Sequence, residues 1–328
     1  MENTYEYFTQ KCNSNVGDGN EMSLSTTPEA GVVGKMIKPF SILFSIIKSR
    51  TLVYAFALAT VGTFLISSGL KVPDFLVLIR LIPSVYFLAL ATYLYNDLTD
   101  YDVDKVNSRD INYSSKKSHY NQILYSTIGF FVLSTLLAFS INMQTGVGSL
   151  AFLGLAIVYS HPKIQLKKIF LVKTIVTATG GFIASLMGAL AVQHISYVGI
   201  SASVIFFLMY FINGPLGDIG DINGDKKGGR RTIPIVLGVK KTFGVIFGAV
   251  SLMALILLVN YSFFGLHVVG LALGLMICIF IAFRIKKLFS QYENKKKLSQ
   301  TRTSVRFGIF AIQISMLIGM TMNNFAIW

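Results

Sequence analysis

The chain consists of long apolar runs separated by short polar stretches. Windows of about 20 mostly apolar residues are long enough to cross the hydrocarbon core of a bilayer as helices. Nine such windows occur, at residues 51–69, 75–95, 122–141, 145–160, 170–191, 197–216, 242–260, 264–284 and 305–327. The pattern predicts an all-α integral membrane protein with about nine transmembrane helices.

The segment before the first apolar run is polar. Residues 1–34 are rich in Asn, Ser, Thr, Gly and Glu and show no apolar periodicity, so we expect a disordered tail. The segment 36–47 combines two flanking lysines with several apolar residues and predicts a short interfacial helix. We therefore divide the chain into a polar tail, 1–34, and a membrane domain, 35–328.

Composition narrows the class of protein. A mean hydropathy of +0.62, with 53% hydrophobic and 13% charged residues, is typical of membrane proteins. The net charge of +14 does not indicate a nucleic-acid partner, because the basic residues occupy short loops between apolar runs instead of one face of a soluble domain. Cys12 and Cys278 form neither a disulfide framework nor a metal motif.

Loop charge predicts the orientation. If the N-terminal tail is cytoplasmic, only Lys71 and Arg80 of the 29 Lys and Arg residues fall on the other side. The short loops near Asn142, His194 and Ser262 carry no basic residue. Since cytoplasmic loops of membrane proteins are enriched in Lys and Arg, we expect the N-terminus and the basic loops in the cytoplasm.

An acidic pattern follows the second apolar run directly. If the helix continues, Asn96, Asp100 and Asp104 lie at i, i+4 and i+8 and share one face, and Asp97 lies close to it. Asp102 points away from that face. Carboxylates at the end of a membrane span are energetically expensive, so they indicate a functional site with a cationic partner.

The same spacing recurs 121 residues later, at Asp218, Asp221 and Asp225, where it closes another apolar run. Two solvated helix ends would be the alternative explanation. The chain has 15 acidic residues, five of them in the first 30 positions, and seven of the other ten belong to these two stretches. This concentration favours a shared intramembrane site at the cytoplasmic ends of spans two and six.

Paired carboxylates of this kind suit Mg²⁺, which prefers oxygen ligands and commonly completes its shell with phosphate. Mg²⁺ neutralises the oxygens of a diphosphate and makes it a better leaving group. Basic side chains in the same loops are candidates for holding the remaining charge. They are Lys105, Arg109, Lys163, Lys167, Lys226, Arg230 and Arg231. Each of them is equally consistent with a role in topology alone.

A diphosphate site beside an apolar helix bundle indicates an isoprenoid substrate whose tail lies in the bundle. Loss of diphosphate would leave an allylic cation that must be shielded from water. Aromatic faces stabilise such a cation, although aromatic residues are also common at membrane interfaces. Candidates at suitable depth are Phe44, Tyr93, Tyr95, Tyr159, Tyr210 and Phe211.

These motifs resemble those of the UbiA superfamily of intramembrane prenyltransferases. The first pattern matches the family's Asn-Asp-x-x-Asp-x-x-x-Asp motif, and the second matches its Asp-x-x-Asp-x-x-x-Asp motif. Tyr159 to Lys163, continued by Leu166 to Lys168, resembles the Tyr-x-x-x-Lys element after span four. Residues 232–238 resemble the stretch after the second motif, and the similarity covers roughly residues 38–327.

The resemblance implies nine helices around a central cavity that opens to the bilayer. It implies Asn96, Asp100, Asp104, Asp221 and Asp225 as ligands of Mg²⁺ and diphosphate, assisted by Lys163 and Lys167. One feature differs: an Arg-Pro-x-x-Ser-Gly-like loop follows the first motif in many members, whereas this chain continues from Asn107 as Asn-Ser-Arg-Asp-Ile-Asn. That loop lies over the cavity in the family, so the identity of the acceptor stays open.

Three functions are compatible with these observations. The first is a Mg²⁺-dependent transferase that moves a prenyl group from a polyprenyl diphosphate to a lipophilic or aromatic acceptor. The second is a UbiA-type terpene cyclase, in which the same cation reacts with its own double bonds. A transporter with an acidic cation site is the third, and acids near the bilayer midplane would favour it. Here the acids lie at the ends of the spans, which favours an enzyme.

The orientation is testable with single cysteines introduced into a variant that lacks Cys12 and Cys278. Cysteines at positions 115 and 228 are expected to react with a membrane-impermeant thiol reagent only from the cytoplasmic side, and one at position 262 only from the other side. Reaction of positions 115 and 228 from opposite sides would contradict both the nine-span threading and the shared site.

Overall fold

The computed structural model describes residues 51–69, 75–99, 120–161, 163–164, 166–192 and 196–325. The predicted tail 1–34, the segment 36–47, and Asp100, Asp104, Lys105 and Arg109 lie outside the described residues. The side chain of Lys167 is also outside them, although its backbone is described.

The described residues form helices. In chain order these are α2 (Thr51–Ser68), α3 (Phe75–Thr99), α6 (Tyr120–Phe139), α7 (Met143–Ser160), the short 3₁₀ helix η1 (Leu166–Lys168), α8 (Val172–Leu190), α9 (Tyr197–Gly220), α10 (Ile222–Lys227), α11 (Ile233–Leu237), α12 (Val239–Phe263), α13 (Val268–Phe289) and α14 (Lys295–Phe325). Eight of them are long and apolar enough to cross a membrane, and α2 is a ninth apolar helix of similar length. The all-α, multi-pass prediction is confirmed, since in lipid a helix satisfies all its backbone polar groups internally.

Predicted and observed span boundaries agree to within five residues at all but one position. The exception is the last span, which we expected at 305–327, whereas α14 begins ten residues earlier at Lys295. Residues 295–304 include Lys295, Lys296, Lys297, Gln300 and Arg302, so their low hydropathy hides a helix that extends beyond the apolar window.

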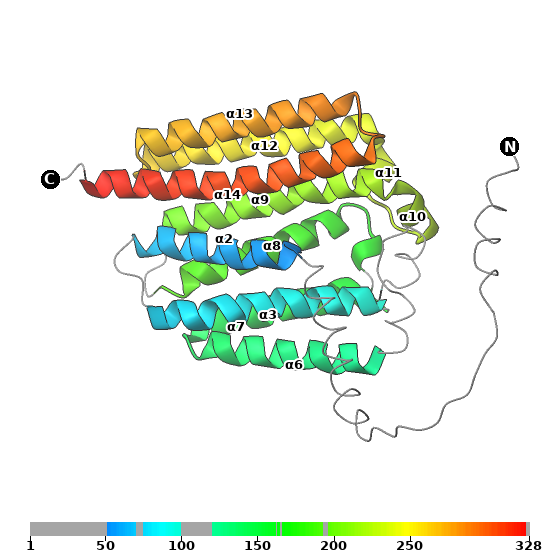
Figure 1. The fold of residues 1–328 in the computed structure, drawn as a ribbon, viewed down its shortest axis with the longest axis horizontal. Coiled ribbons are helices and arrows are strands. Elements are labelled where there is room, and N and C mark those ends of the chain that lie inside the picture. The colour runs from blue at the N-terminus through cyan, green and yellow to red at the C-terminus, as the bar shows by residue number, and fades with distance from the viewer. Residues whose placement is uncertain are drawn as a thin grey trace, which may run out of the picture. The chain divides into compact units, whose positions relative to one another are not determined.

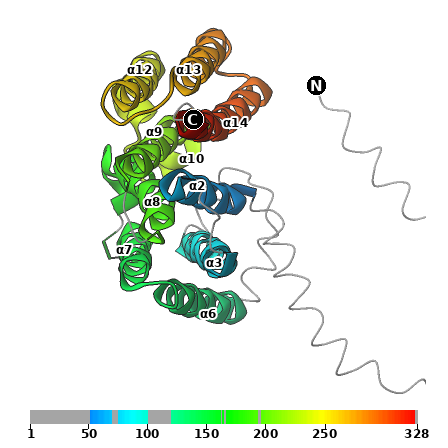
Figure 2. The same cartoon turned by 90° about the vertical axis from the view of Figure 1, so that its left-hand side faces the viewer.

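The helices form layers. Figure 2 shows α12, α13 and α14 on one side, α3, α6 and α7 on the other, and α2, α8 and α9 between them. The packing agrees, because α8 contacts both α2 and α9, α3 contacts α6, and α13 contacts α14. The buried apolar side chains form two clusters, one around α9, α12, α13 and α14 and one around α2, α3, α6 and α8. The middle layer joins them.

Small and hydroxylated residues bring α2 and α8 close together. The Thr60 hydroxyl donates to the Ala184 carbonyl at 2.7 Å, and Thr63 and Ser185 share a hydrogen bond of 2.6 Å. A Cβ added at Gly188 would overlap the Thr60 carbonyl oxygen, so the two backbones meet there without an intervening side chain. Gly188 thus allows the close packing of α2 and α8.

The direction of the helices brings both acidic patterns to one end of the bundle. In Figure 1 the C-terminal ends of α3 and α9 and the N-terminal end of α14 all lie on the side that carries α10 and α11. At the opposite end, Asn142 and Ser196 cap α7 and α9 by accepting hydrogen bonds from the backbone N–H groups of Thr145 and Gly199. The fold therefore places the expected site at one end of the middle layer.

Substitution at the α2–α8 contact tests this packing. We expect Gly188→Ala to destabilise the protein by about 1–3 kcal/mol, because neither backbone can yield to a methyl group. Gly129→Ala in α6 is the control, because nothing lies within 4 Å of the added Cβ. Thermal unfolding in detergent measures both variants. Equal midpoints for the two would contradict the close backbone contact.

Candidate active site

The second acidic pattern lies where α9 ends and α10 begins. Asp218 is in the last turn of α9, Asp221 is the residue between the two helices, and Asp225 is on α10. Asp218 and Asp225 are buried, with 5% and 1% of their surface exposed, whereas Asp221 is half-buried. The helix break turns this second set of carboxylates back toward α8, an arrangement that the sequence spacing alone did not predict.

Lys173, near the N-terminus of α8, binds two of these carboxylates. Its Nζ lies 2.6 Å from Asp218 Oδ1 and 3.3 Å from Asp225 Oδ2. The Lys173 side chain is itself largely buried. An isolated buried charge is very costly, so the lysine and the two carboxylates depend on one another.

A second cation completes this cluster. Arg230 Nη1 lies 3.2 Å from Asp225 Oδ1, and the Arg230 backbone N–H donates to the Asp225 carbonyl at 2.8 Å. Arg230 is buried, with 8% of its surface exposed. We refer to Lys173, Asp218, Asp225 and Arg230 as the ion cluster. Asp225 is thus held from both sides by cations on two different segments.

Sequence reasoning selected Arg230 but missed Lys173. A signal was available, because an ionisable side chain inside a predicted span is by default a functional-site candidate. Lys173 lies at the start of the predicted span 170–191 and follows the apolar stretch Ile169 to Val172. At a span end, a lysine that serves topology and one that binds an acid have the same sequence signature.

The first acidic pattern is described only at its beginning. Asp97 is 5% exposed at the end of α3, and Asn96 is half-buried beside it. Ser160, the last residue of α7, donates from its hydroxyl to Asn96 Oδ1 at 3.1 Å. This hydrogen bond fixes the amide of the first motif against the end of α7, where the Tyr159 element begins.

A cavity of about 160 Å³ lies between α2, α3, α7, α8 and α9, and Asn96 is one of its lining residues. Its walls are mainly apolar and aromatic and include Phe56, Phe152 and Leu155. Three of the expected aromatic candidates line it, namely Tyr93, Tyr159 and Tyr210, whereas Tyr95 and Phe211 do not. We refer to this space as the tail cavity. Phe44 lies outside the described residues.

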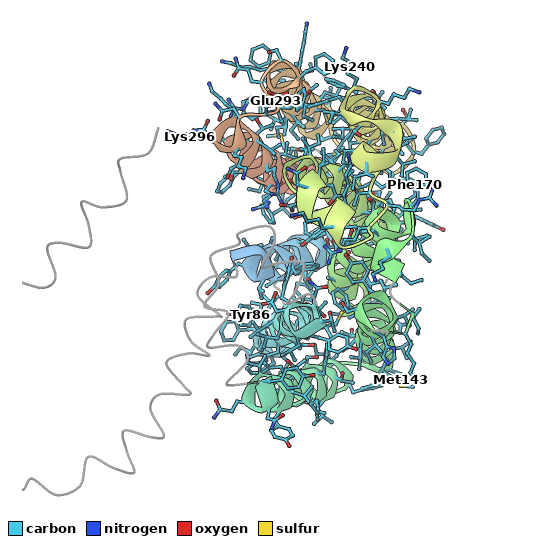
Figure 3. The ribbon with its side chains drawn as sticks, turned by 90° about the vertical axis from the view of Figure 1, so that its right-hand side faces the viewer. Tyr86, Met143, Phe170, Lys240, Glu293 and Lys296 are labelled. Carbon is cyan, nitrogen blue, oxygen red and sulfur yellow. The ribbon has the colours of Figure 1, made fainter. Side chains whose placement is uncertain are left out.

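The expected basic residues divide into buried and exposed ones. Lys163, Lys226 and Arg231 are exposed, and Arg230 belongs to the ion cluster. The loops that carry them are joined, because the Arg231 backbone N–H donates to the Lys168 carbonyl at 3.2 Å. Figure 3 views the bundle from this end. Phe170, which precedes α8 in the chain, and Lys240 and Lys296 lie at the periphery of the bundle in this view. Lys163, Lys226 and Arg231 are therefore exposed, whereas Arg230 is buried in the ion cluster.

The donor set is chemically suited to Mg²⁺. Asp218 Oδ2 is buried and accepts no hydrogen bond from any described residue, which leaves an anionic oxygen available to a cation. Within the described residues, no three His, Cys, Asp or Glu side chains form a metal-binding group. Since Asp100 and Asp104 lie outside these residues, the described carboxylates are only part of the expected donor set.

Comparison with known proteins agrees with the motifs. The model of the UbiA prenyltransferase family matches residues 53–328. The digeranylgeranylglyceryl phosphate synthase of Pyrococcus furiosus is 28% identical over 251 residues, which are 76% of this chain and 86% of the relative. That of Pyrococcus horikoshii is 27% identical over 282 residues, which are 84% of this chain and 95% of the relative.

Solved structures show the same fold. A digeranylgeranylglyceryl phosphate synthase superposes with a TM-score of 0.69 at 18% identity, over 87% of this chain and 99% of the other. A UbiA homologue from Archaeoglobus fulgidus, bound to DMAPP and Mg²⁺, superposes with a TM-score of 0.61 at 16% identity, over 84% and 99%. At this identity the likeness extends to the fold alone.

The ion cluster is testable by a double-mutant cycle. We expect Lys173→Met to lower the free energy of unfolding in Mg²⁺-free detergent by about 3–5 kcal/mol, because it leaves two buried carboxylates without their shared cation. Asp218→Asn in the same background should restore part of that stability, so that the double variant loses less than the sum of the single losses. Strictly additive losses would contradict the pairing of Lys173 with Asp218.

Proposed function

Because the chain belongs to the UbiA prenyltransferase family, we propose that it transfers the prenyl group of a polyprenyl diphosphate to an acceptor within the membrane and releases diphosphate. The observation that carries this proposal is the position of the buried carboxylates Asp218 and Asp225 at the same end of the bundle as Asn96, which lines the tail cavity. Such an arrangement suits a substrate with an anionic head and an apolar tail.

The acidic residues are proposed to hold the diphosphate through Mg²⁺. The metal ligands would be Asn96, Asp100, Asp104, Asp221 and Asp225, with Asp97 and Asp218 supporting them. The Asp225 oxygens also contact Lys173 and Arg230, so a metal there would share this carboxylate with the two cations. Bound there, Mg²⁺ would supply positive charge to the diphosphate oxygens and lower the cost of their departure. Support comes from the oxygen-only donor set and from the Mg²⁺-bound A. fulgidus homologue with the same fold.

Basic side chains of the surrounding loops are proposed to bind the outer diphosphate oxygens. Lys163 and Lys226 are exposed at this end, and Arg231 lies on the loop joined to Lys168. Lys105, Arg109 and Lys167 complete the proposed set. Arg230 is a further candidate, and its guanidinium also binds Asp225, which would position that carboxylate.

The tail cavity is proposed to take the first part of the prenyl chain. Its apolar walls exclude water from the allylic carbon as the bond to diphosphate breaks, and water would otherwise capture the developing cation. The faces of Tyr93, Tyr159 and Tyr210 line this space and would stabilise positive charge by cation–π interaction. Ser160 would hold the Asn96 amide in place through the hydrogen bond already present.

The acceptor is proposed from the relatives. Several are named for the product digeranylgeranylglyceryl phosphate, and we take a hydroxyl of a prenylated glyceryl phosphate as the acceptor group. The hydroxyl oxygen would bond to C1 of the donor, the C1–O bond to diphosphate would break with its electron pair, and the hydroxyl proton would leave with the diphosphate. This acceptor is lipophilic, as expected, and is not aromatic.

Product analysis with purified protein tests this function. Incubation with Mg²⁺, geranylgeranyl diphosphate and geranylgeranylglyceryl phosphate should give a diether lipid and free diphosphate. Without the acceptor, we expect the donor to persist. A cyclic hydrocarbon or alcohol formed without acceptor would contradict the transferase proposal and indicate the terpene cyclase. Shorter and longer prenyl diphosphates in the same assay would define the accepted chain length.

Single substitutions test the two acidic sets. Asp100→Ala and Asp221→Ala are each expected to reduce turnover by about 100-fold or more, since a lost metal ligand removes several kcal/mol of charge stabilisation. Both variants should remain folded and membrane-inserted, because each loses a charge that the protein without metal does not need. Asp102→Ala is the control, because on a continued helix, as expected from the sequence, it would point away from the shared face. Near-full activity of either of the first two would contradict the two-set site.

A further inference from the structure

A second cavity adjoins the ion cluster on the side of α14. It lies between α8, α9 and α14 and also has a volume of about 160 Å³. Lys173, Arg302 and Arg306 line it, and Asp218 is the one carboxylate among the described residues that line it. We refer to this space as the basic cavity. Lys173 is paired with Asp218 and Asp225, so the further cations that line this cavity are the two arginines, Arg302 and Arg306.

The two arginines of α14 are placed for a ligand. Arg302 and Arg306 are four residues apart, so they lie on one face of the helix, and both border the cavity. Arg306 Nε is buried and donates no hydrogen bond to any described residue. Arginine within a membrane span is expensive, and a role in topology alone would not require it to face a cavity. This unmet donor, together with a second arginine that lines the same cavity, suits an anionic occupant.

The backbone of α9 makes room for Arg302. A Cβ added at Gly217 would lie 2.9 Å from Arg302 Nη2, so the guanidinium rests on a part of α9 that has no side chain. Gly217 immediately precedes Asp218. This contact places Arg302 at the level of the ion cluster, while Arg306 lies one helical turn, about 5 Å, farther along α14.

The basic cavity and the tail cavity share two wall residues. Tyr210 of α9 and Thr177 of α8 line both spaces. A polar group in the basic cavity would therefore lie one side chain away from a prenyl chain in the tail cavity. Two separate spaces that meet at a common wall suit two substrates that must react with each other.

We propose that Arg302 and Arg306 bind the phosphate of the acceptor lipid and so select an anionic acceptor. This inference rests on the proposed transferase function and adds the residues that would recognise the second substrate. Two guanidinium groups on one face match the oxygens of a phosphate monoester, to which arginine donates in pairs. The glycerol hydroxyl of such a lipid lies a few bonds from its phosphate and can reach the wall shared with the tail cavity.

The depth of the arginines distinguishes this phosphate from the donor diphosphate. The acidic residues proposed to hold the diphosphate include Asp221, beyond the end of α9, and Asp225 on α10. The basic cavity, which Arg306 lines, instead extends to Met209, Tyr210 and Asn213, two to three turns before the end of α9. An anion held there lies farther into the bundle than one bound at the helix ends.

Direct binding measurements test this assignment without depending on turnover. Geranylgeranylglyceryl phosphate and a non-reactive thiolo analogue of geranylgeranyl diphosphate are titrated separately into wild type, Arg302→Gln and Arg306→Gln in detergent. Each substitution should weaken binding of the glyceryl phosphate by about 10- to 100-fold and change donor binding by less than about twofold. Arg306→Lys should recover part of the affinity, because it retains the charge but not the paired donors.

The matched control is Arg284→Gln. Arg284 is another arginine of the same basic end with a buried Nε that lacks a partner among the described residues, but it borders a different pocket, next to Lys287 and Lys297. It should leave both affinities unchanged. If an arginine substitution reduces folding, Gly217→Ala provides a second probe, because the added methyl group displaces the Arg302 guanidinium without removing its charge. This variant should selectively weaken binding of the glyceryl phosphate.

The outcomes separate this inference from the proposed function. Equal loss of donor and acceptor affinity would assign the arginines to the diphosphate and overturn the inference, as would unchanged affinity for both ligands. The wild-type protein could form no diether product while the arginine variants selectively lose glyceryl phosphate binding. That result would support the anion site but refute the proposed transferase function. Binding of the neutral analogue geranylgeranylglycerol as tightly as the phosphate would also overturn the inference.

Discussion

The ion cluster is the constraint on which the arrangement of the site depends. Asp218 and Asp225 lie almost without exposure at the end of α9 and on α10, and each would be intolerable there without a cation. Lys173 brings α8 to both carboxylates, and Arg230 ties the following loop to Asp225. Removing two charges from water costs several kcal/mol per ion, so such a cluster is a weak source of stability. The presence of this ion cluster in an apolar bundle is better explained by a function that needs anionic oxygens there.

Two cavities meet beside the ion cluster. On one side lies the tail cavity, with aromatic walls and a single amide, Asn96, from the first motif. On the other side lies the basic cavity, with Arg302 and Arg306. Helices α8 and α9 form the boundary, and Tyr210 and Thr177 belong to both sides. A reaction between two lipids needs this geometry, because each must be held by its own headgroup while their reactive atoms meet.

Much of the architecture could be predicted from the sequence, because a bilayer leaves the chain few alternatives. Apolar runs must form helices, and their length is set by the membrane, so the windows located every long helix. The start of α14 could not be found in this way, since residues 295–304 are polar and helical at once. The helix break at Asp221 was likewise hidden, because the spacing of the three aspartates is equally regular on a continuous helix.

The site was predicted in part. The repeated acidic spacing identified Asp218, Asp221 and Asp225, since carboxylates are rare and costly in such a chain. The cations that face them were harder to identify. Lys173, Arg302 and Arg306 lie near span ends, where Lys and Arg also occur merely to set orientation, and only their three-dimensional partners distinguish the two roles. Arg230, selected as a diphosphate ligand, also binds Asp225, a contact that its sequence position does not reveal.

The most direct test of this account is to locate the metal. Crystals grown with Mn²⁺ and a non-reactive thiolo analogue of geranylgeranyl diphosphate would show the metal by its anomalous scattering. The account predicts metal between the ends of α3 and α9, bound by oxygens of Asp221 and Asp225 and of the first motif, with the first isoprene units of the analogue in the tail cavity. Metal elsewhere in the bundle, or a prenyl chain outside that cavity, would contradict it.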